Sequence, residues 1–280
     1  MIFLILAILC SSSLALILKQ GHVKNSNTVL LINANYLTAS SIALVFVIFE
    51  YGFHYSLNSI LFGLVLGLLF VSTFILYSKA ISQAGTALAT VSARLSILIP
   101  VILSIIYFGE SPDLKMLIGF LLALVTLYLF YLSLKNHTNH PGTGNKYIYL
   151  FLLLIGIGFV DFAMKMFEHN FPKEEKGLFV FTIFFSAFIY TTTYLKVKKI
   201  KFDKSTYRLG LLLGIPNVFA IHFLLAALSE LPAIVVFPIQ NIGVIVITAI
   251  AAYLIWKEKI NLYGKIAIAF GIAAILLLKL

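Results

Sequence analysis

The chain has 280 residues, of which 61% are hydrophobic and only 11% are charged, and its mean hydropathy is +1.07. This composition excludes a soluble globular protein, which needs far more polar surface. The formal net charge of +10 does not indicate nucleic acid as a partner, because the lysines lie mostly at the ends of apolar runs, where they set topology and meet anionic lipid head groups. The single cysteine, Cys10, excludes an intrachain disulfide and a cysteine-based metal site.

Uncharged apolar runs of about 20 residues, the length that crosses a bilayer, recur along the chain. They predict an all-α integral membrane protein with ten transmembrane helices. In chain order the predicted spans are residues 2–20, 28–49, 58–80, 84–107, 113–134, 147–166, 177–195, 206–229, 231–256 and 261–279. The polar segment 135–146 separates five spans from five, and we interpret it as a solvated linker whose histidines hold no metal.

The two groups of five spans repeat one another. The third and eighth spans align at a spacing of 147 residues, which places the motif Gly63-x-x-x-Gly67 on Gly210-x-x-x-Gly214. Small residues at this spacing let two membrane helices approach closely, so we expect these glycines at helix contacts. Because five is an odd number, the second group enters the membrane from the opposite side. The sequence therefore predicts an inverted repeat, an architecture found in many secondary transporters.

The basic residues indicate how the chain is oriented. Thirteen of them lie in the loops of one face, and four lie in the loops of the other face or at the C-terminus. The positive-inside rule then places both termini outside the cytoplasm.

Each half carries a proline-bearing span, a turn that contains a glutamate, and a following span rich in glycine and alanine. These elements are Pro100, Gly109-Glu110 and Gly119 in the first half, and Pro238, Lys257-Glu258 and Ala267 in the second. Small-residue turns, predicted over residues 80–89 and 227–236, follow the third and eighth spans. The pattern covers the whole chain and resembles the EamA-like members of the drug/metabolite transporter superfamily.

The resemblance implies ten helices as two inverted five-helix repeats, residues 1–134 and 147–280, joined by the linker 135–146. It also implies a central cavity and alternating-access movement of small metabolites, often outward. Two features depart from the family. Its members usually have cytoplasmic termini, against the lysine count, which we favour for this chain. They also often carry an arginine-aromatic pair in the second span, where this chain has Asn35-Tyr36.

Ionisable groups inside spans are costly and mark functional sites. Arg94 lies in the middle of the fourth span, and the repeat places it opposite Gln240 and Asn241 of the ninth. Its planar fork suits a substrate carboxylate or phosphate, and a structural ion pair with an internal carboxylate is an equal alternative. Asp161 precedes Lys165 by four residues on one helix face, which allows a structural pair; the alternative is that Asp161 binds an exchanging proton or a substrate ammonium.

Other polar residues complete the expected cavity. The predicted substrate-binding set is Arg94, Asp161, Asn35, Tyr36, Tyr77, Asn217, His222, Gln240 and Asn241. For His222 we favour a hydrogen-bonded core histidine over a titrating group. The spans contain three prolines that free backbone carbonyls and allow kinks or hinges, namely Pro100, Pro216 and Pro238.

Four charged residues near span ends receive mainly structural interpretations. Lys19 aligns with Lys165 at a spacing of 146 residues, and Glu110 aligns with Glu258 at 148. The lysines are candidates for coupling or ion pairing, but we favour snorkelling to the interface. For each glutamate we favour a role in the turn, capping the following helix or bonding backbone.

We therefore expect a multi-pass protein of the plasma or inner membrane that is a secondary active transporter of small metabolites such as amino acids or organic anions, with export as the expected direction. No nucleotide-binding loop is present, and we expect no enzymatic activity, no cofactor and no bound metal. The expected partners are the small-molecule substrate, the lipid bilayer, and a proton or a counter-exchanged substrate. The oligomeric state stays open, and a monomer is compatible with this architecture. The alternative is a membrane-embedded enzyme or flippase acting on a lipid-linked substrate.

Overall fold

The computed structural model describes residues 1–23, 26–51, 56–135, 146–257 and 261–279. Within these ranges the chain forms ten α-helices: α1 (Ile2–Val23), α2 (Thr28–Phe46), α3 (Leu57–Leu95), α4 (Leu98–Phe108), α5 (Leu114–Lys135), α6 (Lys146–Asn170), α7 (Lys176–Val197), α8 (Lys204–Leu228), α9 (Ala233–Trp256) and α10 (Leu262–Lys279). A π-helical turn, Val47–Tyr51, extends α2, and a 3-10 turn, Lys173–Glu175, precedes α7. The predicted all-α fold is confirmed.

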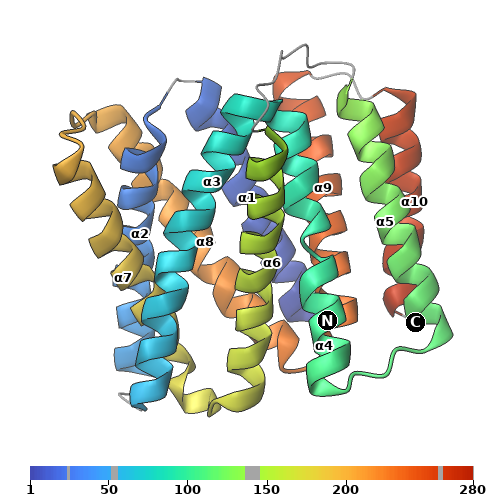
Figure 1. The fold of residues 1–280 in the computed structure, drawn as a ribbon, viewed down its shortest axis with the longest axis horizontal. Helices are drawn as coiled ribbons and strands as arrows, with labels where there is room; N and C mark the ends of the chain where they lie inside the picture. Colours follow the sequence, from blue (N-terminus) through green and yellow to red (C-terminus); the bar gives the residue numbers. More distant parts are fainter. Residues whose placement is uncertain (24–25, 52–55, 136–145, 258–260, 280) are drawn as a thin grey trace.

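The helices have the length and apolarity of membrane spans. Nine helical segments in the described part of the chain are long and apolar enough to cross a bilayer, and a shorter apolar helix, Leu262–Leu278, follows them. The helices run roughly parallel or antiparallel, and both chain ends lie toward the bottom of Figure 1. We call that end of the molecule, where α4 connects to α5, the lower face.

The third and fourth predicted spans are joined differently from the expectation of a turn over residues 80–89. Helical hydrogen bonding continues from Leu57 to Leu95, and the break comes at Ser96-Ile97, before α4. A straight helix of this length would measure about 58 Å, far more than the about 30 Å of a hydrocarbon core, and α3 instead turns across the upper end (Figure 1). The alanine-rich sequence there contains no proline, so the helix bends without ending.

The two halves are interleaved. Helix α1 packs on α8 and α9 of the second half, and α6 packs on α3 and α4 of the first. We call α3, α4 and α6 the first triplet, and α1, α8 and α9 the second triplet. Equivalent helices pair directly at the two edges of the molecule, α2 with α7 and α5 with α10 (Figure 1). Two inverted repeats thus form one body, and neither half keeps its own first helix.

The repeated glycines lie at equivalent helix contacts. A Cβ atom on Gly67 would lie 2.7 Å from the carbonyl oxygen of Ile183 in α7, and one on Gly214 would lie 2.5 Å from the carbonyl oxygen of Asn35 in α2. These glycines therefore bring α3 against α7 and α8 against α2, in both cases with backbone against backbone.

The turns after α4 and α9 share a backbone conformation as well. Gly109 has φ 67° and Lys257, which lies 148 residues later, has φ 56°. Both values belong to the left-handed region in which helices commonly end. The inverted repeat therefore extends to the conformation of single residues, even where a lysine replaces the glycine.

Candidate functional site

The centre of the site is Arg94, in the last turn of α3. Its Nη1 donates a hydrogen bond to Oδ1 of Asn241 in α9 at 2.9 Å, so the contact joins the two triplets. The amide of Asn241 is held in turn, because its Nδ2 donates to the carbonyl oxygen of Phe237 at 3.0 Å. The buried Nε of Arg94 has no hydrogen-bond partner among the described residues. Arg94 as a whole keeps part of its surface accessible.

Two further groups lie within electrostatic range of the Arg94 guanidinium. Asp161 of α6 and Tyr77 of α3 both interact with it electrostatically. The Tyr77 hydroxyl also shares a hydrogen bond of 3.2 Å with Oγ1 of Thr90, which lies beyond the bend of the same helix. The site therefore contains a cation, a carboxylate, an amide and a phenol, supplied by both triplets.

Four of the remaining predicted binding residues lie elsewhere. Nδ2 of Asn217 in α8 donates to Oδ1 of Asn35 in α2 at 3.1 Å, a contact within the α2–α8 interface. Tyr36 is buried with its ring 6.3 Å from that of Phe184 in α7. The ring of His222 lies 5.2 Å from that of Phe46, an aromatic contact between α8 and α2. Gln240 is half-buried on α9, next to Asn241.

The prolines occupy two kinds of position. Pro216 lies inside α8 and Pro238 inside α9, where each removes an intrahelical hydrogen bond. Pro100 lies in the first turn of α4. Pro100 has no backbone N–H and cannot donate to the carbonyl of Ser96, four residues earlier. The helix is broken at this point, between α3 and α4.

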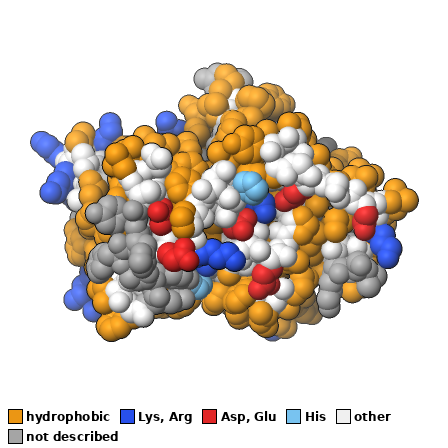
Figure 2. Space-filling view, turned by 90° about the horizontal axis from the view of Figure 1, so that it is seen from below, with side chains coloured by type: hydrophobic (Ala, Val, Ile, Leu, Met, Phe, Trp, Pro, Cys, Tyr) orange, Lys and Arg blue, Asp and Glu red, His pale blue; other side chains and the backbone are white. Residues whose placement is uncertain are grey.

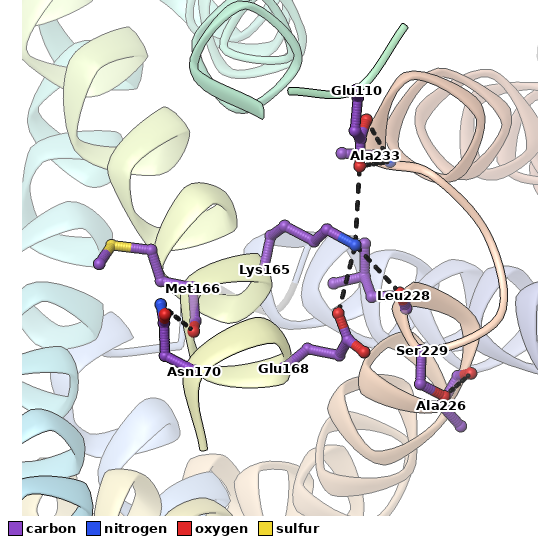
Figure 3. A network of polar contacts seen from close by, with 9 residues as sticks. All are labelled: Glu110, Lys165, Met166, Glu168, Asn170, Ala226, Leu228, Ser229 and Ala233. Atoms are coloured by element: carbon purple, nitrogen blue, oxygen red, sulfur yellow. Dashed lines mark hydrogen bonds and ion pairs between the residues drawn. The ribbon is translucent and has the colours of Figure 1, made fainter. Parts of the chain in front are cut away.

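Lys165 is bonded inside the protein, so the expectation that it snorkels is wrong. Only 8% of the residue is exposed. Its Nζ lies 3.2 Å from Oε2 of Glu168 and 3.6 Å from Oε1 of Glu110, and it donates to the carbonyl oxygen of Leu228 at 3.2 Å (Figure 3). Lys165 therefore has acceptors nearer the helix end than Asp161, and the Asp161–Lys165 pair considered from the sequence is not formed. Its repeat equivalent, Lys19, lies half-buried in α1.

Glu110 caps a helix, but not the one that follows it. Both of its carboxylate oxygens accept the backbone N–H of Ala233, at 2.9 and 3.0 Å, at the start of α9 (Figure 3). The following helix, α5, is capped by Asp113, whose Oδ1 accepts the N–H of Met116 at 2.7 Å. Because Asp113 already fills the local position, Glu110 is available to the other half. Glu258 lies outside the described residues.

Sequence reasoning missed the partners of these charges for a physical reason. Glu110 binds the backbone N–H of Ala233, and Lys165 binds the backbone carbonyl of Leu228. Nearly every residue has these backbone groups, so the sequence does not distinguish the ones that act as partners.

Figure 2 shows the lower face, where acidic and basic side chains gather near the centre and hydrophobic side chains surround them.

Comparison with known proteins agrees with the geometry. Residues 1–132 and 145–280 each match the EamA-like transporter family. An uncharacterized protein of Haemophilus influenzae is 31% identical over 285 residues, which cover 97% of this chain and 95% of that protein. One solved crystal structure superimposes with a TM-score of 0.79 at 17% identity, over 100% of this chain and 97% of the other, and so shares the fold. Ten helices in two inverted halves, with two matches that leave only a short segment between them, show that this multi-pass membrane protein belongs to the EamA-like transporter family of the drug/metabolite transporter superfamily.

Proposed function

We propose that this protein is a secondary active exporter of small metabolites with an anionic group, such as amino acids or organic anions. Transport proceeds by alternating access between the two triplets, in the plasma or inner membrane. The observation that carries the proposal is the hydrogen bond from Arg94 to Asn241, which joins the triplets, while the Arg94 Nε has no hydrogen-bond partner in the described part of the chain.

An arginine inside the spans is costly unless it binds something. The neutral Asn241 oxygen satisfies one of its five donors, and Asp161 acts on it only at longer range. A substrate carboxylate or phosphate supplies two oxygens in the geometry of the guanidinium fork and compensates its charge. Because the site is built from both triplets, a substrate bound there contacts both moving parts.

Asp161 gives the site a second charge. Its carboxyl group lies within electrostatic range of the same guanidinium, which supports a role in binding the ammonium of an amino acid or an exchanging proton. We propose a smaller binding set than the sequence indicated, with Arg94, Asp161, Tyr77 and Asn241 at its centre and Gln240 beside it. In this arrangement Asn35, Tyr36, Asn217 and His222 support the helices around the site.

The test of Arg94 is counterflow of labelled metabolites in proteoliposomes. We expect Arg94→Gln to lower the flux at least tenfold, since a charge-assisted hydrogen bond contributes about 1.5–3 kcal/mol, and we expect Arg94→Lys to restore part of it because the charge returns without the fork. The matched control is Arg208→Gln, which removes the other arginine of the chain from an exposed position at the start of α8. Full flux in folded Arg94→Gln would exclude Arg94 from the site.

The role of Asp161 is tested separately. If Asp161 carries the coupling proton, Asp161→Asn keeps substrate counterflow but loses the response to an imposed pH gradient. Asp203→Asn is the matched control, because Asp203 is exposed outside the spans. A pH response that survives Asp161→Asn contradicts the coupling role.

Orientation follows from the basic residues. We propose that the face opposite the lower face, to which the sequence assigns thirteen basic residues, is cytoplasmic, so that the lower face lies outside. A cysteine introduced at Lys201, with Cys10 replaced by serine, then resists impermeant thiol reagents in intact cells. Rapid labelling at Lys201 contradicts this orientation.

A further inference from the structure

We propose that Glu110 and Lys165 form a latch that holds the two triplets together at the lower face, and that each transport cycle requires this latch to open. The latch consists of these two side chains and the backbone groups that they bind in the second triplet, the N–H of Ala233 and the carbonyl of Leu228. The inference rests on the proposed function, because a latch between triplets has a cycle to control only if the protein works by alternating access.

The two triplets are packed more closely within themselves than against each other, so movement of one triplet relative to the other is the least hindered. Within the first triplet α6 packs along α3 and α4, and within the second α1 packs along α8 and α9, whereas the triplets meet more sparingly, through α4 with α9 and α6 with α8. The polar contacts that cross this boundary include Arg94–Asn241 at the substrate site and the latch below it. Two rigid groups with a small shared boundary are suited to rigid-body rearrangement.

The latch holds the connection between α8 and α9 from both sides. Lys165 binds the carbonyl of Leu228, the last residue of α8, and Glu110 binds the N–H of Ala233, the first residue of α9 (Figure 3). The Glu110 carboxylate therefore lies at the N-terminus of α9, the positive end of the helix dipole. Lys165 belongs to α6 and Glu110 to the connection that leaves α4, so together they tie the lower ends of two helices of the second triplet to the first.

The closed latch satisfies its buried charges. The Lys165 ammonium donates to Glu168 and to the Leu228 carbonyl, each at 3.2 Å, and forms an ion pair with Glu110 at 3.6 Å. Glu168 belongs to the same helix as Lys165, so it stays with the lysine when the triplets separate. An opened latch therefore leaves Lys165 one ion pair, and water at the membrane edge replaces the other acceptors. The Lys165 charge is therefore compensated in both the closed and the open arrangement, which allows the element to switch between them.

The position of the latch relative to Arg94 gives it a function in access. Ala233, Phe237 and Asn241 follow one another at intervals of four residues and so lie on one face of α9. Ala233 binds the latch, Asn241 binds Arg94, and Phe237 lies between them with 1% of its surface exposed. The closed latch thus shuts the lower face below the substrate site, and its release opens a path along this face of α9.

A reversible cross-link tests the proposal directly. In a Cys10→Ser background, Glu110→Cys and Ala233→Cys are combined, and counterflow is measured in proteoliposomes before oxidation, after oxidation, and after reduction with dithiothreitol. We expect oxidation to lower the flux at least tenfold and reduction to restore it. The control pair is Thr73→Cys with Gly156→Cys, which joins α3 to α6 within the first triplet, where a Cβ atom on Gly156 would lie 3.7 Å from that of Thr73; its cross-link should leave the flux unchanged. Undiminished flux in the fully cross-linked latch pair overturns the proposal.

A second measurement removes the charge of Glu110, and with it the ion pair to Lys165. With Cys10→Ser, the labelling rate of Phe237→Cys by a thiol reagent is compared with and without Glu110→Gln in detergent. Loss of a charge-assisted contact should raise the labelling rate roughly 10- to 100-fold, and an unchanged rate contradicts the latch. If Arg94→Gln keeps full flux while the cross-link still stops it, the binding site is wrong and the latch stands; if Arg94→Gln abolishes flux and the cross-link has no effect, the latch is wrong and the site stands.

Discussion

Gly210→Ala should destabilise the protein because it forces α8 away from α2. A Cβ atom at position 210 would lie 2.2 Å from the carbonyl oxygen of Leu31, whereas an unstrained carbon–oxygen contact is about 3.4 Å. The shortfall is about 1.2 Å, and the oxygen belongs to a helical backbone, which cannot rotate away. Overpacking of this kind costs about 3 kcal/mol at the upper end of its usual range. Alanine recovers about 1 kcal/mol through its higher helix propensity, so the net loss is about 2 kcal/mol.

The matched control is Gly63→Ala, at the equivalent position of the first half. There the new Cβ would lie 3.0 Å from the Thr182 side chain and 3.4 Å from the nearest backbone oxygen. A displacement of a few tenths of an ångström relieves both contacts, and the gain in helix propensity offsets the cost. Thermal unfolding in detergent should therefore show a clear fall in melting temperature for Gly210→Ala and little change for Gly63→Ala. Equal melting temperatures, or the reverse order, would refute this reasoning.

Three further predictions concern stability, each measured by thermal unfolding in detergent. Asn33→Leu should cost about 1 kcal/mol, because the buried Nδ2 of Asn33 donates to the hydroxyl of Thr191 at 3.1 Å; an unchanged melting temperature would show that this contact between α2 and α7 is not stabilising. Lys199→Gly should stabilise the protein by about 1 kcal/mol, since Lys199 has φ 51° at the end of α7, where glycine avoids the Cβ clash; a lower melting temperature would contradict that. Asp203→Ala should lower stability at neutral pH, because hydrogen bonds from the Thr206 side chain and from the Thr206 backbone N–H, the latter at 2.7 Å, hold the pKa of the Asp203 carboxyl below its usual value. A depressed pKa contributes stability above the unfolded-state pKa that is lost as the pH falls through the folded one, so the difference between Asp203→Ala and the native protein should shrink in acid, and a difference that grows there would contradict the assignment.

The helices and their repeat could be predicted because both depend on local, periodic signals. Apolar runs of membrane length identify spans without knowledge of their neighbours. Gly63 and Gly210 occupy equivalent positions in the two halves, and each lies at a close contact with a helix of the other half. The bend in α3 could not be predicted in the same way. Its alanine-rich sequence is compatible with a turn or with a continued helix, and the decision comes from packing on other helices.

Among the charged residues, too, some positions could be predicted from local sequence and others depend on contacts with distant helices. Arg94 could be identified as a central residue because an arginine is costly anywhere inside a span, and the repeat pointed to the neighbourhood of Asn241. Lys165 and Glu110 lie near span ends, where charge is inexpensive, so their sequence context favoured solvent exposure and local capping. Their actual partners lie on α8 and α9, and a single sequence carries no record of which backbone groups meet across the halves.

The interleaving of the halves has a consequence for biogenesis. Membrane helices are made from the N-terminus onward, yet α1 packs on α8 and α9, which begin at Lys204 and Ala233. Helix α1 must therefore remain in the bilayer without its final neighbours until most of the chain has been inserted. A ribosome stalled after the first five helices would therefore leave α1 in the bilayer without α8 and α9, the helices on which it packs.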